Sequence, residues 1–400
     1  MNKTFLLLIV LASCISLSFE NKVIEEHKSF SITLDPGDNL AAAILDADSG
    51  SIICLNDGDY GNVDLIDINK NGYVTIRSIN PKGASLGYTQ ISNCEFISIE
   101  DVIINGAIIN ACSRHIKIKS SKFIDVLTLR NDGGCTPTSN LDIILDGNIF
   151  NGLDEGIWEG GLSIGLTGSN SGIVITNNIF GGGGCSDGIQ LIGGVGGVQI
   201  GPGNIFRDLI QGSCNAPVDA IQAYGAGSGN VIEGNYFYNN TVNIGIYDGG
   251  SDYIIRDNVF DTPNDLDYSA LQLGGINTLL MEHNTFINTV LGIGTKHTNS
   301  PNINWTVQNN IFDNSFFTAS GDQPGFGDNG VKQFNMKSRG GTTNPEGTNN
   351  IIDNAVYSGK GSLFNWIGWE LKESSPGKKS GNDKKDLGVN YYGPHVSMSE

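Results

Sequence analysis

Side chains able to move protons follow two short apolar stretches in the second half of the chain. Tyr247 and Asp248 follow the first stretch, and Lys296, 49 residues after Tyr247, follows the second together with His297. Tyrosine, lysine and histidine can remove a proton from carbon or protonate a leaving oxygen when their pKa values suit the reaction. The sequence therefore nominates Tyr247, Lys296 and His297 as candidate catalytic residues.

Glutamines recur beside these stretches and suggest a binding surface. With the stretches aligned on Ile189, Ile221, Ile246, Leu271 and Ile293, the next position holds Gln190, Gln222, Tyr247, Gln272 and Gly294, and the preceding position holds Gly188, Ala220, Gly245, Ala270 and Gly292. Side chains alternate along a strand, so the alignment predicts an outward trough of small residues edged with amides. An extended glycan would fit it, bound by Gln190, Gln222 and Gln272 with Tyr224 and Asp248 beside them. A self-satisfied amide ladder is an equally good interpretation.

Acidic residues near this trough form no regular metal-binding pattern. Asp187 and Asp219 head two of the aligned stretches, where we expect them to point inward or to cap a turn rather than to catalyse. Asp154 and Glu155 accompany Trp158 in a longer interval, where the ring could stack on a sugar and the carboxylates could hold calcium. No metal site is predicted, and calcium is the one cofactor left open.

Eight phenylalanines at nearly even spacing define the architecture that must position these residues. They are Phe123, Phe150, Phe180, Phe206, Phe237, Phe260, Phe286 and Phe312, separated by 27, 30, 26, 31, 23, 26 and 26 residues, and asparagine stands two residues before seven of them. This period, with glycine turns and no helical pattern, is typical of a solenoid of stacked coils. We expect the rings to stack inside, and the asparagines to adopt left-handed turn angles while their amides bond neighbouring coils.

The two ends of the chain differ from the repeat. Residues 1–18 place Lys3 before an apolar run and are predicted to be a signal peptide. The β-helix domain should then span 19–369, with a short helix over 39–46 covering its open N-terminal end. The period breaks at 313–349, which we expect to be an inserted loop, and 370–400 should be a polar tail.

Charge and cysteines restrict the environment and the partners. A net charge of −19 makes nucleic acid an unfavourable partner, and no second long apolar stretch suggests a membrane anchor. We therefore expect a secreted, extracellular monomer. In an oxidising compartment Cys185 and Cys214 should pair, because both precede matching strands, and Asn239 and Asn304 lie in glycosylation sequons.

Three runs near the N-terminus resemble a known superfamily. The runs Asp38–Ala43 (Asp-Asn-Leu-Ala-Ala-Ala), Leu55–Gly61 and Val74–Arg77 are similar to the start of secreted proteins of the pectate-lyase-like superfamily, including its chondroitinase B and alginate lyase branch. Ser374–Gly377 and Asp386–Gly388 resemble the closing motif of such chains. The resemblance implies an all-β fold, a single-stranded right-handed parallel β-helix, here of about ten coils.

Most catalytic signatures of that superfamily are missing from this chain. No adjacent pair of aspartates occurs, which disfavours hydrolysis of the pectin type. Leu127–Arg130 resembles the arginine-bearing strand of the alginate lyase branch, but the His-Gly that follows there is absent, so no catalytic role is transferred to Arg130 or Lys119. The basic residues from Arg114 to Arg130 are interpreted as an ordinary solvated strand face, with polyanion binding as the alternative.

Together these features predict a protein that acts on an extracellular polysaccharide. A lyase or epimerase of uronate-containing glycans is the enzymatic interpretation, because such chemistry needs a base at C5 and an acid at the leaving oxygen. A non-catalytic carbohydrate-binding or cell-surface structural protein is the alternative. The neutral amides and the missing lyase signatures favour it.

Overall fold

The computed structural model describes most of the chain and shows it to be built almost entirely of parallel strands. The described residues are 31–110, 113–130, 141–151, 160–166, 171–182, 185–213, 215, 217–225, 227–263, 269–293, 302–319, 331–333, 335–339, 347–362 and 365–390. Within these ranges the helices are α1 (Leu40–Asp46) and the 3-10 helix η1 (Trp366–Trp369). No described helix is long and apolar enough to cross a membrane.

One side of the solenoid is a 13-stranded parallel sheet, called sheet A here. In spatial order its strands are β1 (Ser31–Leu34), β2 (Ile52–Leu55), β5 (Asn69–Ser78), β7 (Glu95–Glu100), β9 (Arg114–Lys119), β12 (Ile143–Asp146), β15 (Ile173–Thr176), β18 (Val198–Ile200), β21 (Val231–Glu233), β24 (Gly250–Arg256), β27 (Ile276–Glu282), β30 (Ile303–Gln308) and β33 (Val331–Gln333). Strands rich in isoleucine point alternate side chains into the core.

The short phenylalanine strands form a second side. They are β10 (Lys122–Phe123), β13 (Ile149–Asn151), β16 (Ile179–Gly181), β19 (Ile205–Arg207), β22 (Tyr236–Tyr238), β25 (Val259–Asp261), β28 (Thr285–Ile287), β31 (Ile311–Asp313), β34 (Met336–Ser338) and β35 (Ile351–Ile352). Each of them pairs in parallel with the strand at the same position of the next coil, as with Phe206 and Phe237.

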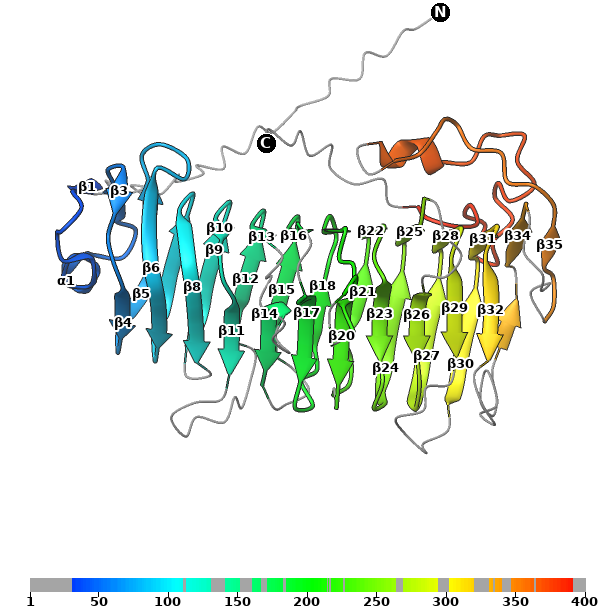
Figure 1. Cartoon of the computed structure of the whole chain (residues 1–400), viewed down its shortest axis with the longest axis horizontal. Helices are drawn as coiled ribbons and strands as arrows, with labels where there is room; N and C mark the ends of the chain where they lie inside the picture. The colour runs from blue at the N-terminus through cyan, green and yellow to red at the C-terminus, as the bar shows by residue number, and fades with distance from the viewer. Residues whose placement is uncertain are drawn as a thin grey trace, which may run out of the picture.

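The glutamine strands form the third side, and they carry the candidate site. They are β11 (Leu127–Arg130), β14 (Gly160–Gly165), β17 (Asp187–Ile192), β20 (Asp219–Tyr224), β23 (Val242–Ile246), β26 (Ser269–Leu273), β29 (Val290–Ile293) and β32 (Phe316–Ala319). Towards the N-terminus these two sides merge, because β8 (Ile103–Asn110) pairs with both β10 and β11, and β6 (Ala84–Ser92) pairs with β3 (Gly58–Asp59) and β4 (Val63–Ile66). Figure 1 shows the resulting row of coils, a parallel β-helix.

The phenylalanine ladder is confirmed. From Phe123 to Phe312 the eight rings stack in one column, with centroids of successive rings 4.6 to 5.0 Å apart and planes within 13° of parallel. The separation matches the strand spacing and lies at the short end of aromatic packing distances. All eight are at most 3 % exposed, so the ladder forms the centre of the core.

The asparagine ladder is confirmed as a hydrogen-bonded column, but its backbone conformation was predicted wrongly. Asn204 Nδ2 donates to Asn235 Oδ1 at 2.9 Å, and Asn204 Oδ1 accepts from the backbone N–H of Asn178 at 2.9 Å. The left-handed residue is instead the one before each ladder asparagine, such as Asn177 with φ 55° and His283 with φ 54°. The ladder asparagines are fully buried, and their amides satisfy backbone groups inside the turn.

The N-terminal helix is confirmed as a local element. Helix α1 begins after Asn39, whose side-chain oxygen accepts a hydrogen bond from the Ala42 N–H at 3.0 Å. Leu40 and Ile44 point into the core. Whether the helix protects the sheet edge stays a prediction, as does the number of complete coils.

The β-helix continues through part of the region expected to be an inserted loop. Strands β32, β33 and β34 lie within 313–349 and pair with β29, β30 and β31. Lys337 takes the ladder position after Phe312, which is why a search for phenylalanine misses this coil. Residues 320–330 and 340–346 lie outside the described ranges, so a loop there stays a prediction.

Residues 365–390, called the C-terminal segment here, pack against the outer side of the phenylalanine strands (Figure 1). Trp366 and Val389 are buried against Ile205, Tyr236, Val259 and Ile287, and Leu371 and Leu387 against Ile311 and Met336. The expected polar tail therefore includes a packed apolar side.

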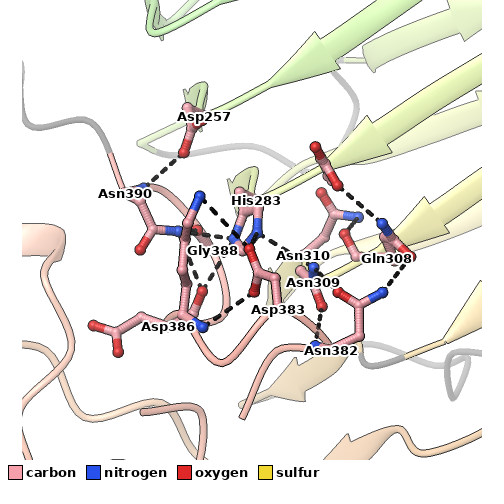
Figure 2. Close-up of polar contacts among 12 residues, drawn as sticks. Asp257, His283, Gln308, Asn309, Asn310, Asn382, Asp383, Asp386, Gly388 and Asn390 are labelled. Carbon is pink, nitrogen blue, oxygen red and sulfur yellow. Dashed lines mark hydrogen bonds and ion pairs between the residues drawn. The ribbon is translucent and has the colours of Figure 1, made fainter. Parts of the chain in front are cut away.

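The polar part of this contact centres on His283 (Figure 2). Its Nε2 lies 3.0 Å from Asp383 Oδ2, and its Nδ1 lies 2.8 Å from Asn390 Nδ2 and 3.1 Å from the Asp386 carbonyl oxygen. The Asn390 N–H donates to Asp257 Oδ1 at 3.0 Å. The segment is thus tied to the coils by hydrogen bonds as well as by apolar packing.

Candidate functional site

The register of the glutamine strands corrects the predicted alignment by two residues in two coils. Ile244, not Ile246, pairs with Ile221 and Leu271, so Gly245 lies between Gln222 and Gln272. Likewise Gly292, and not the predicted Gly294, pairs with Gln272; Gly294 itself lies outside the described residues. The prediction that Tyr247 occupies a place in the glutamine column is therefore wrong. The predicted alignment was wrong by two residues because the segment before the glutamine strand is shorter in these two coils than the alignment assumed.

The predicted glutamine column does exist. Gln190 pairs with Gln222, and Gln222 and Gln272 flank Gly245. Gln190 is 5 % exposed, while Gln222 and Gln272 are half-buried. In the other direction Ser163 and Thr128 continue the column, so amides and hydroxyls follow one another along the axis.

The small residues do not form an exposed trough. Gly188 and Ala220 are buried, and a β-carbon at Gly188 would come within 3.2 Å of Phe206 and Leu209 side chains and within 2.5 Å of the Ala220 carbonyl oxygen. The small side chains are required because this position packs against the phenylalanine ladder. The half-buried part of the surface is the glutamine column itself.

Two buried aspartates lie under this column, one in each of two neighbouring coils. Gln190 Nε2 donates to Asp187 Oδ2 at 2.9 Å, and Gln222 Nε2 donates to Asp219 Oδ2 at 3.2 Å. The Asp219 N–H donates to Asp187 Oδ1 at 2.8 Å, which joins the two coils. Both aspartates are buried, with 5 % and 0 % exposure, and their carboxylates belong to the polar network of the glutamine column.

Burial makes these two carboxyls titrate near neutral pH. It raises the pKa of Asp187 to about 6, against the hydrogen bonds from Asp219 and Gln190. Burial and then the charge of Asp187 raise the pKa of Asp219 to about 7. Acidic groups with such pKa values can hold or release a proton at physiological pH.

Tyr247 reaches this network from the end of β23. Its hydroxyl donates to Asp219 Oδ1 at 3.1 Å, and its phenol lies over Gly245, where a β-carbon would be only 2.6 Å from two ring carbons and from the hydroxyl oxygen. The phenol therefore fills the space that the missing glutamine side chain leaves in the column. Burial, and then the charge of Asp219, raise the pKa of Tyr247 far above its usual value, so the phenol keeps its proton.

The other predicted binding residues are spread around this network. Tyr224 ends β20 and is 58 % exposed, so its ring is available to stack on a ligand. Asp248 is half-buried in the bend after Tyr247. Trp158, Lys296 and His297 lie outside the described residues, so the structure neither joins them to Tyr247 nor separates them from it.

Calcium binding stays open, and disulfide pairing stays a prediction. The part of the chain that the structure describes has no group of three or more histidine, cysteine or acidic side chains placed to hold an ion. Asp154 and Glu155, the proposed calcium ligands, fall outside it, as does Cys214, the expected partner of Cys185. Cys54 and Cys94 are free thiols.

The basic cluster on β9 is a set of ion pairs. Arg114 Nε lies 2.7 Å from Glu95 Oε1, His115 Nδ1 lies 2.8 Å from Asp142 Oδ2, and Lys119 Nζ lies 3.9 Å from Asp146 Oδ2. Lys117 Nζ lies 3.7 Å from the centroid of the Tyr73 ring. The structure thus favours an ordinary surface face over a polyanion site, since these basic side chains already contact acidic or aromatic neighbours.

Sequence reasoning missed the link between the aspartates and Tyr247, although a signal was present. Asp-Gly-Ile-Gln190 and Asp-Ala-Ile-Gln222 share the pattern Asp-x-x-Gln in two successive coils. In each pair, the aspartate and the glutamine lie three residues apart on one strand, and their side chains hydrogen-bond to each other. The contact of Tyr247 with Asp219 depends on a ring folding back over Gly245, which no spacing rule reveals.

Comparison with known proteins finds relatives by structure and none by sequence. No protein-family model matches the chain, and no curated protein sequence matches it. The PL6-family alginate lyase AlyGC has a similar structure, with a TM-score of 0.57 and 15 % identity over 92 % of this chain and 59 % of the lyase. A mannuronic-acid-specific family 6 lyase from human gut microbiota gives a TM-score of 0.53 and 14 % identity over 78 % and 86 % of the two chains. This chain thus spans less than two thirds of the length of AlyGC, and the likeness identifies its fold as the parallel β-helix of polysaccharide lyases.

Proposed function

We propose that this protein is exported and acts on an extracellular polysaccharide bound along the glutamine column. The observation that carries the proposal is the contact of the Tyr247 hydroxyl with Asp219, placed between Gln222 and Gln272 on a line of amides and hydroxyls. Amides and hydroxyls bind sugar hydroxyls, and exposed Tyr224 offers a stacking surface. The similar solved structures named above are an alginate lyase and a mannuronic-acid-specific polysaccharide lyase, which supports a polysaccharide as the substrate.

In the enzymatic form of the proposal, the protein is a lyase or epimerase of a uronate-containing chain. Tyr247 then acts as the proton donor, because its raised pKa keeps the hydroxyl protonated. Asp219 accepts the hydrogen bond of that hydroxyl and can accept its proton in turn, since its pKa is about 7. Lys296 and His297 would have to supply the base at C5 and the positive charge that neutralises the uronate.

The enzymatic form is tested with purified protein and alginate, pectate and glycosaminoglycans, with and without calcium. A lyase produces an unsaturated sugar, which is followed by ultraviolet absorbance, and an epimerase changes the composition of the chain without cleaving it. Tyr247→Phe should remove activity while leaving binding. No product from any substrate in either condition would reject the enzymatic form.

A non-catalytic glycan-binding protein is the second candidate, and burial favours it. Asp219 is 0 % exposed, and the Gln190 Nε2 group already donates to Asp187 Oδ2 and to Gln222 Oε1, which is 3.4 Å away. Such groups shape a surface without touching a reacting sugar. Binding on a glycan array that survives Tyr247→Phe, without any product, would select this candidate.

A further inference from the structure

Among the residues that the structure describes, which do not include Lys296 and His297, the charged groups at the glutamine column are carboxylates. Asp187 and Asp219 each accept hydrogen bonds from neutral groups only, namely a glutamine amide with a backbone N–H or a tyrosine hydroxyl. No ion pair formed by the described residues includes either aspartate. Asp248 adds a third carboxyl after β23.

The ligand-facing groups of the column are neutral. Gln222 and Gln272 present amides and Thr128 a hydroxyl, all half-buried. These groups hydrogen-bond to sugar hydroxyls, but they lack the fixed positive charge with which a protein usually receives a carboxylate. Arg130, at the end of β11, lies three coils before Gln222, as the pairings of β11, β14, β17 and β20 show.

We propose that the column from Ser163 to Gln272 selects a neutral, hydroxyl-rich glycan and discriminates against chains that carry a carboxylate on each sugar. The inference rests on the proposed polysaccharide binding in its non-catalytic form, names the substrate class of that site, and opposes the enzymatic form, which needs a uronate chain. A uronate placed on the column would approach two carboxylates that are poorly screened because protein surrounds them. The raised pKa of Asp219, partly caused by Asp187, shows that one extra negative charge is already felt at this position.

The test uses matched probes that differ only in charge. Polygalacturonate and alginate are compared with the same chains after reduction of their carboxyl groups to alcohols, and binding is measured by calorimetry at pH 8. We expect the reduced chains to bind on the order of tenfold more tightly at low salt, a preference that shrinks as added salt screens the repulsion. This salt series uses the unaltered protein, so it does not depend on a variant folding.

Asp187→Asn supplies the second measurement. Asparagine keeps the shape and can still accept from Gln190 and from the Asp219 N–H, while it removes one buried charge. In this variant, the affinity for the uronate form divided by the affinity for the reduced form should be severalfold higher than in the wild type. Exposed Asp46, at the end of α1, gives the control: Asp46→Asn should leave that ratio unchanged.

The outcomes separate the two proposals. Equal or tighter binding of the uronate form at low salt overturns the neutral-glycan inference and leaves polysaccharide binding standing. Absence of binding by either form of every chain overturns the proposed function and this inference with it. A preference for the reduced chain that disappears in high salt supports polysaccharide binding and the neutral-glycan inference, and it counts against the uronate lyase or epimerase of the enzymatic form.

Discussion

The phenol of Tyr247 lies so close to Gly245 that a β-carbon at position 245 would come within 2.6 Å of two ring carbons and the hydroxyl oxygen. Gly245 is the column position between Gln222 and Gln272, so the absence of a side chain there is what lets the phenol cross the column to Asp219. Gly245 thus determines the position of the Tyr247 hydroxyl. Among the described residues, this is the only tyrosine hydroxyl shown to contact these aspartates.

Gly245→Ala should therefore displace Tyr247 without unfolding the protein. The clash involves the far end of a flexible side chain, so the ring can rotate away at a cost of about 1 kcal/mol. We expect the variant to behave like Tyr247→Phe in binding and in any activity, with unfolding in denaturant shifted only slightly. Gly165→Ala is the matched control, because its nearest such contact is ordinary, at 3.8 Å. Unaltered behaviour of Gly245→Ala would mean that the ring position is irrelevant to function.

The inner ladders could be predicted from sequence because stacking repeats the same environment in every coil. Phenylalanine at an interval of 23 to 31 residues has one arrangement in which each ring is buried, and the structure shows that arrangement. The asparagine column was predictable for the same reason, although the left-handed angle falls on its neighbour, such as Asn177 before Asn178.

The outer site was harder to predict because coils differ in length. The strand before Tyr247 contains three aliphatic residues, Val242, Ile244 and Ile246, at alternate positions, and each of them satisfies the same inward pattern. Alternation determines which side chains point inward, but it does not determine which of these three residues pairs with Ile221. An alignment shifted by two residues therefore fits the alternating pattern equally well. Only the strand pairing resolves the choice.

Asp187 and Asp219 should make the protein less stable as pH rises through the neutral range. Their pKa values, about 6 and about 7, lie above the ordinary 3.8, so the unfolded chain ionises these groups first. Their contribution is complete below about pH 4, falls progressively as pH rises and is lost above about pH 7. Between pH 5 and pH 8 the loss is on the order of 4 kcal/mol. Denaturant unfolding of the wild type and of Asp219→Asn at pH 5 and pH 8 measures it.

Asp219→Asn should reduce that difference between the two pH values, because asparagine does not ionise. Asp64→Asn, on the exposed side of β4, should leave it as in the wild type. If the difference in unfolding free energy between the wild type and Asp219→Asn is the same at pH 5 and pH 8, the two carboxyls are not perturbed as described.

Position in the phenylalanine ladder should determine the cost of a truncation. Phe206 stacks on Phe180 and Phe237, at 4.9 and 4.8 Å, whereas Phe123 begins the column and stacks on Phe150 at 4.6 Å. Phe206→Ala should lower the free energy of unfolding by about 3–5 kcal/mol. Phe123→Ala should cost about 0.5–1.5 kcal/mol less, since one ring contact instead of two is lost. Equal losses in chemical denaturation would contradict a separate contribution from stacking.

His283 should be the residue on which the C-terminal segment depends most. It is 4 % exposed in its side chain, and it contacts Asp383 and Asn390 of the segment (Figure 2). His283→Ala would remove these hydrogen bonds and leave a cavity at a buried position, for an expected loss on the order of 3 kcal/mol. His115→Ala removes a histidine–aspartate pair of the same kind from a side chain that is 33 % exposed, and should cost about 1 kcal/mol or less.

Limited proteolysis distinguishes a local effect from a global one. The C-terminal segment crosses the outer side of several coils, so its release exposes Tyr236 and Ile311 without removing any ladder strand. In His283→Ala we expect cleavage within residues 365–390 to become faster than cleavage of the coils. Uniform acceleration across the whole chain would show instead that His283 supports the β-helix itself and that the segment has no independent equilibrium.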